Sequence, residues 1–312
     1  MSTFLRLAVL AVLAAGSLLL PGAALPARAG DPAPDPVQTL DLTVLSYNVH
    51  GVPFIDADMD RRMARIGLAL AELAPDVVAL QEVWRPSDAD ALATAGREAG
   101  LPHVVRLDAE RAGSGLLVLS RFPVAASEFR PFPDNGDLWR ALVGHVDRLA
   151  AKGAAIVRLE TPLGPVALVD THCVAAFRRE RGAPDEMVTH RLSQVRVLVA
   201  ALESAGAGGV PAILCGDLNA LPGSAELKLL RARTGLRDTM GESGRRIDYV
   251  LVRDAPAAAF EVLSAGLALT RRVALEPGLT PIPLSDHPAV LARLRLRRQP
   301  APQANGDSTP PR

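Results

Sequence analysis

The sequence is poor in cysteine and lysine and has no excess of positive charge. The shortage of cysteine and the lack of net charge each argue against a class of protein. Only two of its 312 residues are cysteine, which excludes a small domain held together by several disulfides. Arginine supplies nearly all the positive charge, and the formal net charge of +0 argues against a strongly basic nucleic-acid binder. The sequence is 49% hydrophobic, which is enough for a core, so a chain that is disordered throughout is also excluded.

The N-terminus has the features of an export signal. Arg6 precedes an uncharged apolar run, residues 7–20, and a small-residue pattern, Ala-Arg-Ala, follows at 27–29. This order predicts a secretory signal peptide over residues 1–29 and a secreted or periplasmic product. The alternative is an uncleaved anchor, although the run is shorter than the roughly 20 residues of a membrane span.

Two proline-rich segments flank the main body of the chain. Residues 30–38 are predicted to be a linker and residues 298–312 a disordered tail, which leaves one folded domain over 39–297. Both cysteines, Cys173 and Cys215, lie in that domain. In an exported protein they could form a disulfide, and two buried free thiols are the alternative.

Short apolar runs and helical patterns alternate along the body. Helices are predicted over 61–74, 89–99 and 190–202, the first and last from apolar residues spaced three and four apart. Strands are predicted over 42–47, 77–80, 116–119, 154–159, 166–169, 212–215, 247–252 and 290–294. This mixture indicates an α/β fold, and strands that are apolar on both faces favour two packed sheets with helices outside.

Polar side chains follow most of the predicted strands. They are Asn48, Glu82, Asp170 with His172, Asp217 with Asn219, Asp248, and Asp286 with His287. Such residues at strand ends are expected to converge on one rim of the sheets. Oxygen donors suit a hard cation such as Mg²⁺, and a carboxylate beside a histidine can orient a general base. The pattern therefore predicts metal-assisted hydrolysis.

Each of these residues taken singly also has a structural interpretation. Asn48 or Asp217 alone could cap a turn, and Glu82 alone could be a surface carboxylate. His50 is expected to support the backbone beside Asn48, and His190 to lie on the solvent side of its helix. The functional interpretation rests on the whole set in this order.

Seven segments in this order resemble the endonuclease/exonuclease/phosphatase superfamily. They are LSYNVHG (45–51), LQEVW (80–84), SGLLVLSRFPV (114–124), VDTHCVA (169–175), CGDLNALP (215–222), RIDYVLV (246–252) and PLSDHPAV (283–290). Within the superfamily the chain is most similar to the neutral sphingomyelinases, on the stretch 152–177 and on HRLSQV (190–195). One departure is Cys173, where that branch commonly has leucine after the Thr-His pair.

The resemblance implies a four-layered α/β sandwich of the DNase I type and a hydrolase of phosphodiester or phosphomonoester bonds. It implies Mg²⁺ as the cofactor, with Mn²⁺ as the alternative. Glu82 would be the main metal ligand, Asn48 would lie beside it, and Asp286 would add negative charge at the metal rim.

The resemblance also implies roles for the remaining polar residues. His287 would be the general base that activates water, and Asp248 would hold and polarise it. Asp217 and Asn219 would bind or polarise the phosphate and the nucleophile. His172 would donate to a phosphate oxygen and stabilise the charge of the transition state.

The substrate is expected to be a lipid phosphodiester, such as sphingomyelin, that a monomeric enzyme meets at a membrane surface. The near-neutral charge favours this over nucleic acid, because phosphate contacts dominate the affinity of DNA-binding proteins. Phe129, Phe132 and Trp139 in a loop rich in proline and glycine could enter a membrane interface, or could cap the core.

Two alternatives remain beside the lipid substrate. One is a secreted nuclease or phosphatase of the same superfamily; a nuclease would have a basic strip beside the site, for which FRRERG (177–182) is the compact candidate. A catalytically inactive binding module is disfavoured because Glu82, Asp217 and His287 are all present.

Overall fold

The structure, a computed structural model, describes residues 38–52, 58–107, 113–133, 151–175 and 187–298. The predicted signal peptide, nearly all of the predicted linker and tail, Trp139 and the segment 177–182 lie outside the described residues. Within the described part of the chain, no helix is long and apolar enough to cross a membrane.

Within these described residues, twelve strands form two six-stranded sheets. The first sheet has the order β11-β12-β1-β2-β4-β3, with bounds Ala258–Ala268, Ala289–Arg298, Thr39–Asn48, Val77–Gln81, Leu117–Ser120 and His103–Arg106. The second sheet has the order β5-β6-β7-β8-β10-β9, with bounds Val124–Pro131, Gly153–Thr161, Gly164–His172, Ala212–Asp217, Asp248–Arg253 and Arg237–Asp238.

The pairing of strands explains why polar strand ends meet. One central pair in each sheet is parallel, β1 with β2 and β7 with β8, and the strands that flank each pair are antiparallel to it. The carboxyl ends of a parallel pair lie at one edge, and an antiparallel neighbour begins at that same edge. The ends of β1, β2, β7 and β8 therefore share a rim with the beginnings of β10 and β12.

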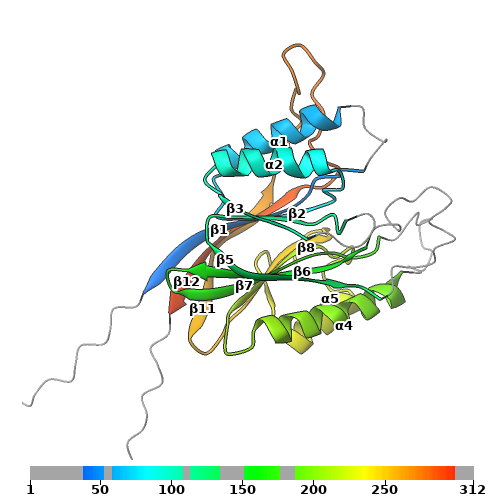
Figure 1. The fold of residues 1–312 in the computed structure, drawn as a ribbon. Coiled ribbons are helices and arrows are strands. Elements are labelled where there is room, and N and C mark those ends of the chain that lie inside the picture. Colours follow the sequence, from blue (N-terminus) through cyan, green and yellow to red (C-terminus); the bar gives the residue numbers. More distant parts are fainter. Residues whose placement is uncertain (1–37, 53–57, 108–112, 134–150, 176–186, 299–312) are drawn as a thin grey trace, which may run out of the picture. The chain divides into compact units, whose positions relative to one another are not determined.

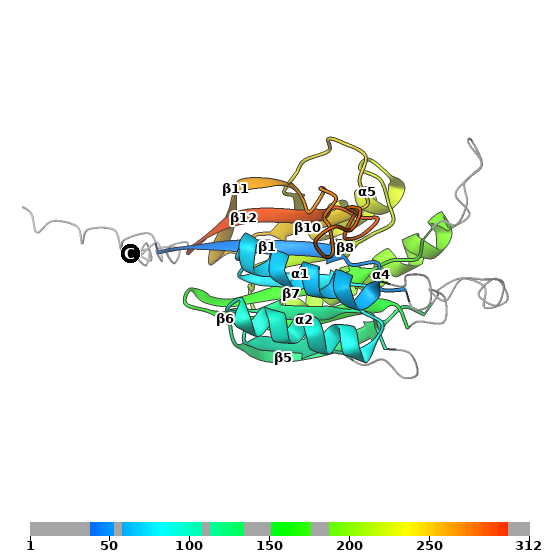
Figure 2. The ribbon, with the colours of Figure 1, turned by 90° about the horizontal axis from the view of Figure 1, so that it is seen from above.

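Helices cover the outer face of each sheet (Figure 1; Figure 2). Helices α1 (Met59–Leu73) and α2 (Pro86–Glu98) pack on the first sheet, whereas α4 (Val188–Ala205) and α5 (Ala225–Thr234) pack on the second. Helix α1 buries the apolar residues Met63, Ile66 and Leu70, and Ala74 ends the helix in a left-handed conformation with φ 45°. These layers confirm the predicted four-layered α/β sandwich.

Side chains from the inner faces of both sheets fill the space between them. Along β1 the alternate residues Leu42 and Val44 join this apolar core, and Ser46 and Asn48 continue the same face toward the rim. All four are buried. The inner face thus changes from apolar to polar along one strand, and the other strands that reach the rim change in the same direction.

Several elements were not expected from the sequence. Strands β3, β5, β9 and β11 and helix α5 did not stand out as apolar runs. Phe132 is buried in the core beneath α4, which confirms the core interpretation for this residue, whereas Phe129 lies on the edge strand β5 and is half-buried. Cys173 and Cys215 are both buried free thiols.

Candidate active site

The predicted polar residues meet at the shared rim of the two sheets. Asn48 ends β1, His172 ends β7, Asp217 ends β8, and Glu82 directly follows β2. Asp248 begins β10 opposite Asp217 in the antiparallel ladder. His287 lies two residues before β12.

Asn48 joins the two sheets at this rim. Its Nδ2 donates to Glu82 Oε1 at 2.9 Å and to Asp217 Oδ2 at 3.2 Å. Its Oδ1 accepts from the backbone N–H of His50 at 2.9 Å. Because Asn48 is fully buried and its Nδ2 donates to both carboxylates, the amide holds them close together across the interface between the sheets.

The backbone at the rim adopts conformations that side chains usually avoid. His50, Glu82 and Asn219 have φ values of 50°, 60° and 49°. Left-handed φ in residues other than glycine costs free energy, so surrounding contacts must hold these three in place. Gly51 also has no room for a side chain, since a Cβ there would lie 2.1 Å from the carbonyl oxygen of Glu82.

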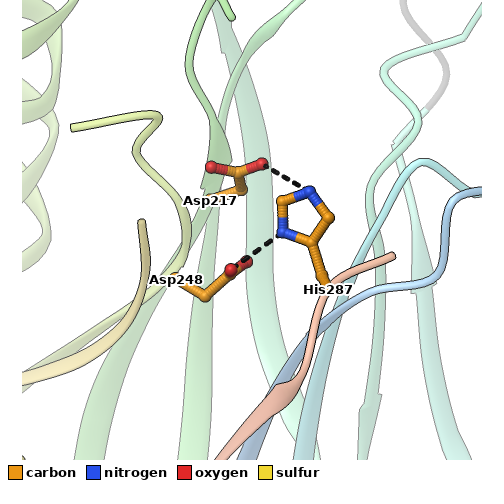
Figure 3. A group of neighbouring side chains, drawn as sticks. All are labelled: Asp217, Asp248 and His287. Carbon is orange, nitrogen blue, oxygen red and sulfur yellow. Dashed lines mark hydrogen bonds and ion pairs between the residues drawn. The ribbon is translucent and has the colours of Figure 1, made fainter. Parts of the chain in front are cut away.

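His287 is held between two buried carboxylates (Figure 3). Its Nδ1 lies 2.8 Å from Asp248 Oδ2, and its Nε2 lies 3.8 Å from Asp217 Oδ2. A carboxylate at Nδ1 favours the tautomer that keeps the proton there, which leaves Nε2 as the atom that faces the site. The imidazole side chain is 16% exposed, so it can reach a bound substrate.

The pKa values in this group depend on how many of its carboxylates have no positive charge beside them. Burial lowers the pKa of His287, but the hydrogen bond with Asp248 and the charges of Asp217 and Asp286 outweigh it and raise that pKa to about 10. Burial, together with the nearby charge of Asp248, raises the pKa of Asp217 to about 7. The pKa of Asp248 is also raised, chiefly by burial. Without an added cation, His287 therefore holds a proton at neutral pH.

His172 has a neighbour to which the sequence assigned no role. Lys152 Nζ lies 2.9 Å from His172 Nε2 and donates to the carbonyl oxygen of Cys173 at 3.2 Å. Since an ammonium group only donates, this contact makes Nε2 the acceptor. The same Nε2 lies 3.6 Å from Asp217 Oδ2 and 3.9 Å from Glu82 Oε1. Donation from His172 to a phosphate stays a prediction and requires this contact to change.

The remaining predicted residues lie at the edge of the group. Asn219 donates from its backbone to Asp217 Oδ1 at 2.8 Å and from Nδ2 to Cys173 O at 3.0 Å, so it fixes the turn after β8. The side chain of Asp286 is 60% exposed and lies 3.8 Å from His50 Nδ1 and 4.0 Å from His287 Nε2. His190, expected on the solvent side of α4, is half-buried.

A polar pair beneath the rim was not expected as a pair. Gln81 Nε2 donates to Asp170 Oδ1 at 2.7 Å, which links β2 of one sheet to β7 of the other. Asp170 is fully buried, and burial raises its pKa well above the ordinary value. The sequence offered one signal for the pair. Each of the two residues comes two positions after an apolar residue of the same strand, and residues at this spacing share a face of the sheet.

The donor set at the rim suits a hard divalent cation. Side-chain oxygens of Glu82 and Asp217 converge on the amide nitrogen of Asn48, and ligand atoms of Asp217, Asp248 and His287 all lie within 4.8 Å of one another. Buried Oδ1 of Asp248 has no hydrogen-bond partner among the described residues. A buried group with this many carboxylates needs positive charge before it can receive a phosphate anion. The residues therefore form a candidate metal site.

A cavity of about 760 Å³ opens beside this group. Asn219, Asp248, Asp286 and His287 line the end nearest the rim. The remaining wall comes from the 220–224 loop, the 245–247 segment and residues of α4 and α5. The site is thus open to a substrate that is larger than a phosphate ion.

The fold and the convergent carboxylates define a known class of protein. The model of the endonuclease/exonuclease/phosphatase family matches residues 45–287, and the chain belongs to this family. The match covers all of the predicted site residues.

Curated relatives of the chain narrow the similarity to enzymes that act on sphingolipids. A Drosophila melanogaster protein with the provisional name of neutral sphingomyelinase is 31% identical over 82% of this chain and 61% of its own length. Human sphingomyelin phosphodiesterase 2 is 26% identical over 87% of this chain and 68% of its own length. The chain thus spans somewhat over three fifths of these relatives. Inositol phosphosphingolipids phospholipase C of Schizosaccharomyces pombe is 32% identical over 58% of this chain and 42% of its own length.

Solved structures confirm the fold. Sphingomyelinase C from Streptomyces griseocarneus superposes with a TM-score of 0.62 at 24% identity, over 81% of this chain and 99% of that one. A beta toxin variant from Staphylococcus aureus with bound magnesium ions superposes with a TM-score of 0.60 at 17% identity, over 81% and 99% of the two chains.

Proposed function

We propose that this protein is an exported, Mg²⁺-dependent phosphodiesterase that hydrolyses the phosphodiester bond of a sphingolipid such as sphingomyelin. The observation that carries the proposal is the approach of His287, held by Asp248, to Asp217 and the Asn48–Glu82 pair at one rim. The names of the curated relatives support a sphingolipid as the substrate.

Glu82 and Asn48 would hold the cation, with Asp286 adding negative charge at the outer edge. When bound, a divalent cation supplies the positive charge that neutralises the phosphodiester and polarises its P–O bonds. Positive charge held there would oppose the effect of Asp248, Asp217 and Asp286 on the pKa of His287, so that Nε2 would be available as a base.

His287 would then take a proton from water through Nε2 while Asp248 holds the imidazolium that forms. The oxygen of that water would attack phosphorus, and the ceramide oxygen would leave with the electrons of its bond and take a proton from solvent, while His287 returns its proton to solvent. Asp217 and Asn219 would orient the water and the phosphate. Lys152 and His172 lie where they could stabilise the charge on the phosphate oxygens.

Export rests on the predicted signal peptide at residues 1–29. N-terminal sequencing of the protein recovered from the periplasm or medium of a producing cell tests it. A chain that begins at Gly30 supports cleavage after Ala29, whereas a chain that retains Arg6 contradicts it.

The direct test measures phosphocholine release from sphingomyelin liposomes at a series of Mg²⁺ concentrations. An inositol phosphosphingolipid and plasmid DNA serve as parallel substrates, and His287→Ala is the blank. We expect Mg²⁺-dependent turnover of at least one sphingolipid that is lost in the blank. DNA cleavage without lipid turnover would move the protein to the nuclease branch of the family, and turnover unchanged by EDTA would contradict metal dependence.

A further inference from the structure

Arg62 of α1 is a buried arginine to which none of the roles above is assigned. Its Nη1 donates to the carbonyl oxygens of Val49 at 2.5 Å and Leu284 at 2.8 Å. Its Nη2 donates to the carbonyl oxygen of His50 at 2.7 Å. The residue is only 2% exposed. Three main-chain oxygens therefore take part in holding one guanidinium group.

These oxygens belong to two segments of the site that are far apart in the sequence. Val49 and His50 directly follow Asn48, on the metal side of the site, whereas Leu284 precedes His287 by three positions, on the base side. The guanidinium has a rigid, planar fork of donors, so a single group can fix the distance between two carbonyl oxygens. Lysine carries its donors on one nitrogen at the end of a shorter, flexible stem, so it lacks the rigid fork that reaches all three oxygens.

Ser285 makes a second link between the same two segments. Its hydroxyl donates to the carbonyl oxygen of Asn48 at 2.7 Å and accepts from the backbone N–H of His287 at 3.1 Å. The side chain is buried as well. One hydroxyl thus spans from the residue that contacts Glu82 to the residue that contacts Asp248.

The segment that Arg62 holds needs external support. His50 has a φ of 50°, which is uncommon for a residue other than glycine, and Gly51 packs directly against the backbone of Glu82. Without donors on the carbonyl oxygens of residues 49 and 50, the segment could relax to an ordinary conformation and shift Asn48 away from Glu82.

We propose that Arg62, together with Ser285, is a positioning residue that sets the separation between the Asn48–Glu82 side of the site and His287. Arg62 touches no reacting atom; it acts through Asn48 and through the segment that carries His287. This proposal rests on the proposed function, because only in a catalytic site does the separation between these two groups matter for a reaction. A change at Arg62 should therefore weaken the response to metal and slow the reaction together.

The variant that tests the proposal is Arg62→Lys in the full chain. It keeps the positive charge and most of the packing, but it lacks the rigid fork of donors that holds the three carbonyl oxygens in place. We expect the Mg²⁺ concentration for half-maximal activity to rise and kcat to fall, each by about 10- to 100-fold, as for other residues that orient metal ligands. Ser285→Ala should change the same two quantities, and the double variant should show less than the product of the single effects.

Arg65→Lys is the matched control. Arg65 lies on the same helix and also donates to a main-chain oxygen, that of Ala274 at 3.1 Å, but this oxygen lies outside both site segments. We expect neither quantity to change in this variant. Equal effects of Arg62→Lys and Arg65→Lys would overturn the proposal, because they would show a general effect on α1.

A measurement without metal or substrate separates this proposal from the proposed function. Backbone hydrogen exchange of His50 and His287, in EDTA, should be faster in Arg62→Lys, whereas exchange within α1 and β1 should match the wild type. Unchanged exchange at both amides, or faster exchange throughout α1, would overturn the positioning role. If the wild type hydrolyses no phosphodiester, the proposed function fails while the exchange experiment still decides the role of Arg62.

Discussion

The space between the two sheets has an apolar half and a polar half, and they are built from the same strands. Toward one end, Leu42 of β1 and Leu294 of β12 are cross-strand partners in a dry core. Toward the rim, Asn48, Gln81 and Asp170 occupy equivalent inward-facing positions. The difference shows that a catalytic rim can be added to a stable sandwich by changing the last inward residue or two of each strand. Stability comes from one half, and chemistry from the other.

The largest expected effect is on the polar half. We expect His287→Ala to lower kcat by about 10²- to 10⁴-fold, which is the usual contribution of a general base, with little change in the thermal unfolding midpoint. Lipid turnover and calorimetric unfolding measure the two quantities. A rate within a few-fold of the wild type would remove His287 from the base role.

The converse change belongs to the apolar half. Leu294→Ala leaves a cavity among fully buried side chains, so the free energy of unfolding should fall by about 2–5 kcal/mol. Because Leu294 lies away from the rim, kcat at a temperature where the variant is folded should stay near the wild-type value. Urea denaturation and lipid turnover check this. A loss of kcat as large as the one at His287 would mean that the two halves are not separable.

A smaller effect is expected at the predicted metal ligand. Glu82→Gln removes one negative charge and should raise the Mg²⁺ concentration for half-maximal activity by at least about tenfold. Glu261→Gln is the matched control, since Glu261 of β11 pairs with Arg297 near the end of β12, which is the end of the sheet opposite the rim. Titration of activity with Mg²⁺ compares the two, and an unchanged midpoint in Glu82→Gln would contradict its assignment as a ligand.

The smallest effect concerns Asp170, which lies between the two halves. Burial raises the pKa of this carboxyl in the folded state above its unfolded value, so the folded protein keeps a proton that the unfolded chain releases. The free energy of unfolding should therefore fall as the pH rises above about 4, by about 1.4 kcal/mol for each pH unit, until the pH exceeds the folded-state pKa. Asp170→Asn removes this dependence, so its stability relative to the wild type should increase from pH 5 to pH 8. Urea denaturation at the two pH values measures it, and a constant difference would contradict a protonated Asp170.

The sequence predicted the interior of the fold better than its edges. The runs that became β1, β2, β7 and β8 lie in the middle of their sheets, where both faces are largely buried and most residues of the predicted runs are apolar. Strands β5 and β11 were missed because they lie at sheet edges and are largely exposed, which removes the apolar signal. Helix α5 was missed for a similar reason, although Ser224 caps its beginning and Gly235 its end.

Within the candidate site, the residues themselves were predictable but their supports were not. Asn48, Glu82 and Asp217 follow apolar runs, and that position alone brought them to attention. Arg62 lies on a helix, where an arginine among polar neighbours reads as a solvent-facing residue, and only the fold brings it to the carbonyl oxygens of Val49 and Leu284. Every residue type has a main-chain carbonyl oxygen, so the identity of the contacted residue does not reveal such a contact. For this reason positioning residues need a structure.

The two sheets repeat one arrangement of strands. At the centre of each sheet lies a parallel pair whose strands are joined by a helix, β1-α1-β2 in the first sheet and β7-α4-β8 in the second. An antiparallel strand lies on each side of the pair, β12 and β4 in the first sheet and β6 and β10 in the second. The central strands of the two sheets thus have the same order and the same pattern of parallel and antiparallel pairing. Asn48 and His172 occupy matching places in the two sheets, as do Gln81 and Asp217. The catalytic group lies where the two sheets meet, so either sheet alone would present only part of it.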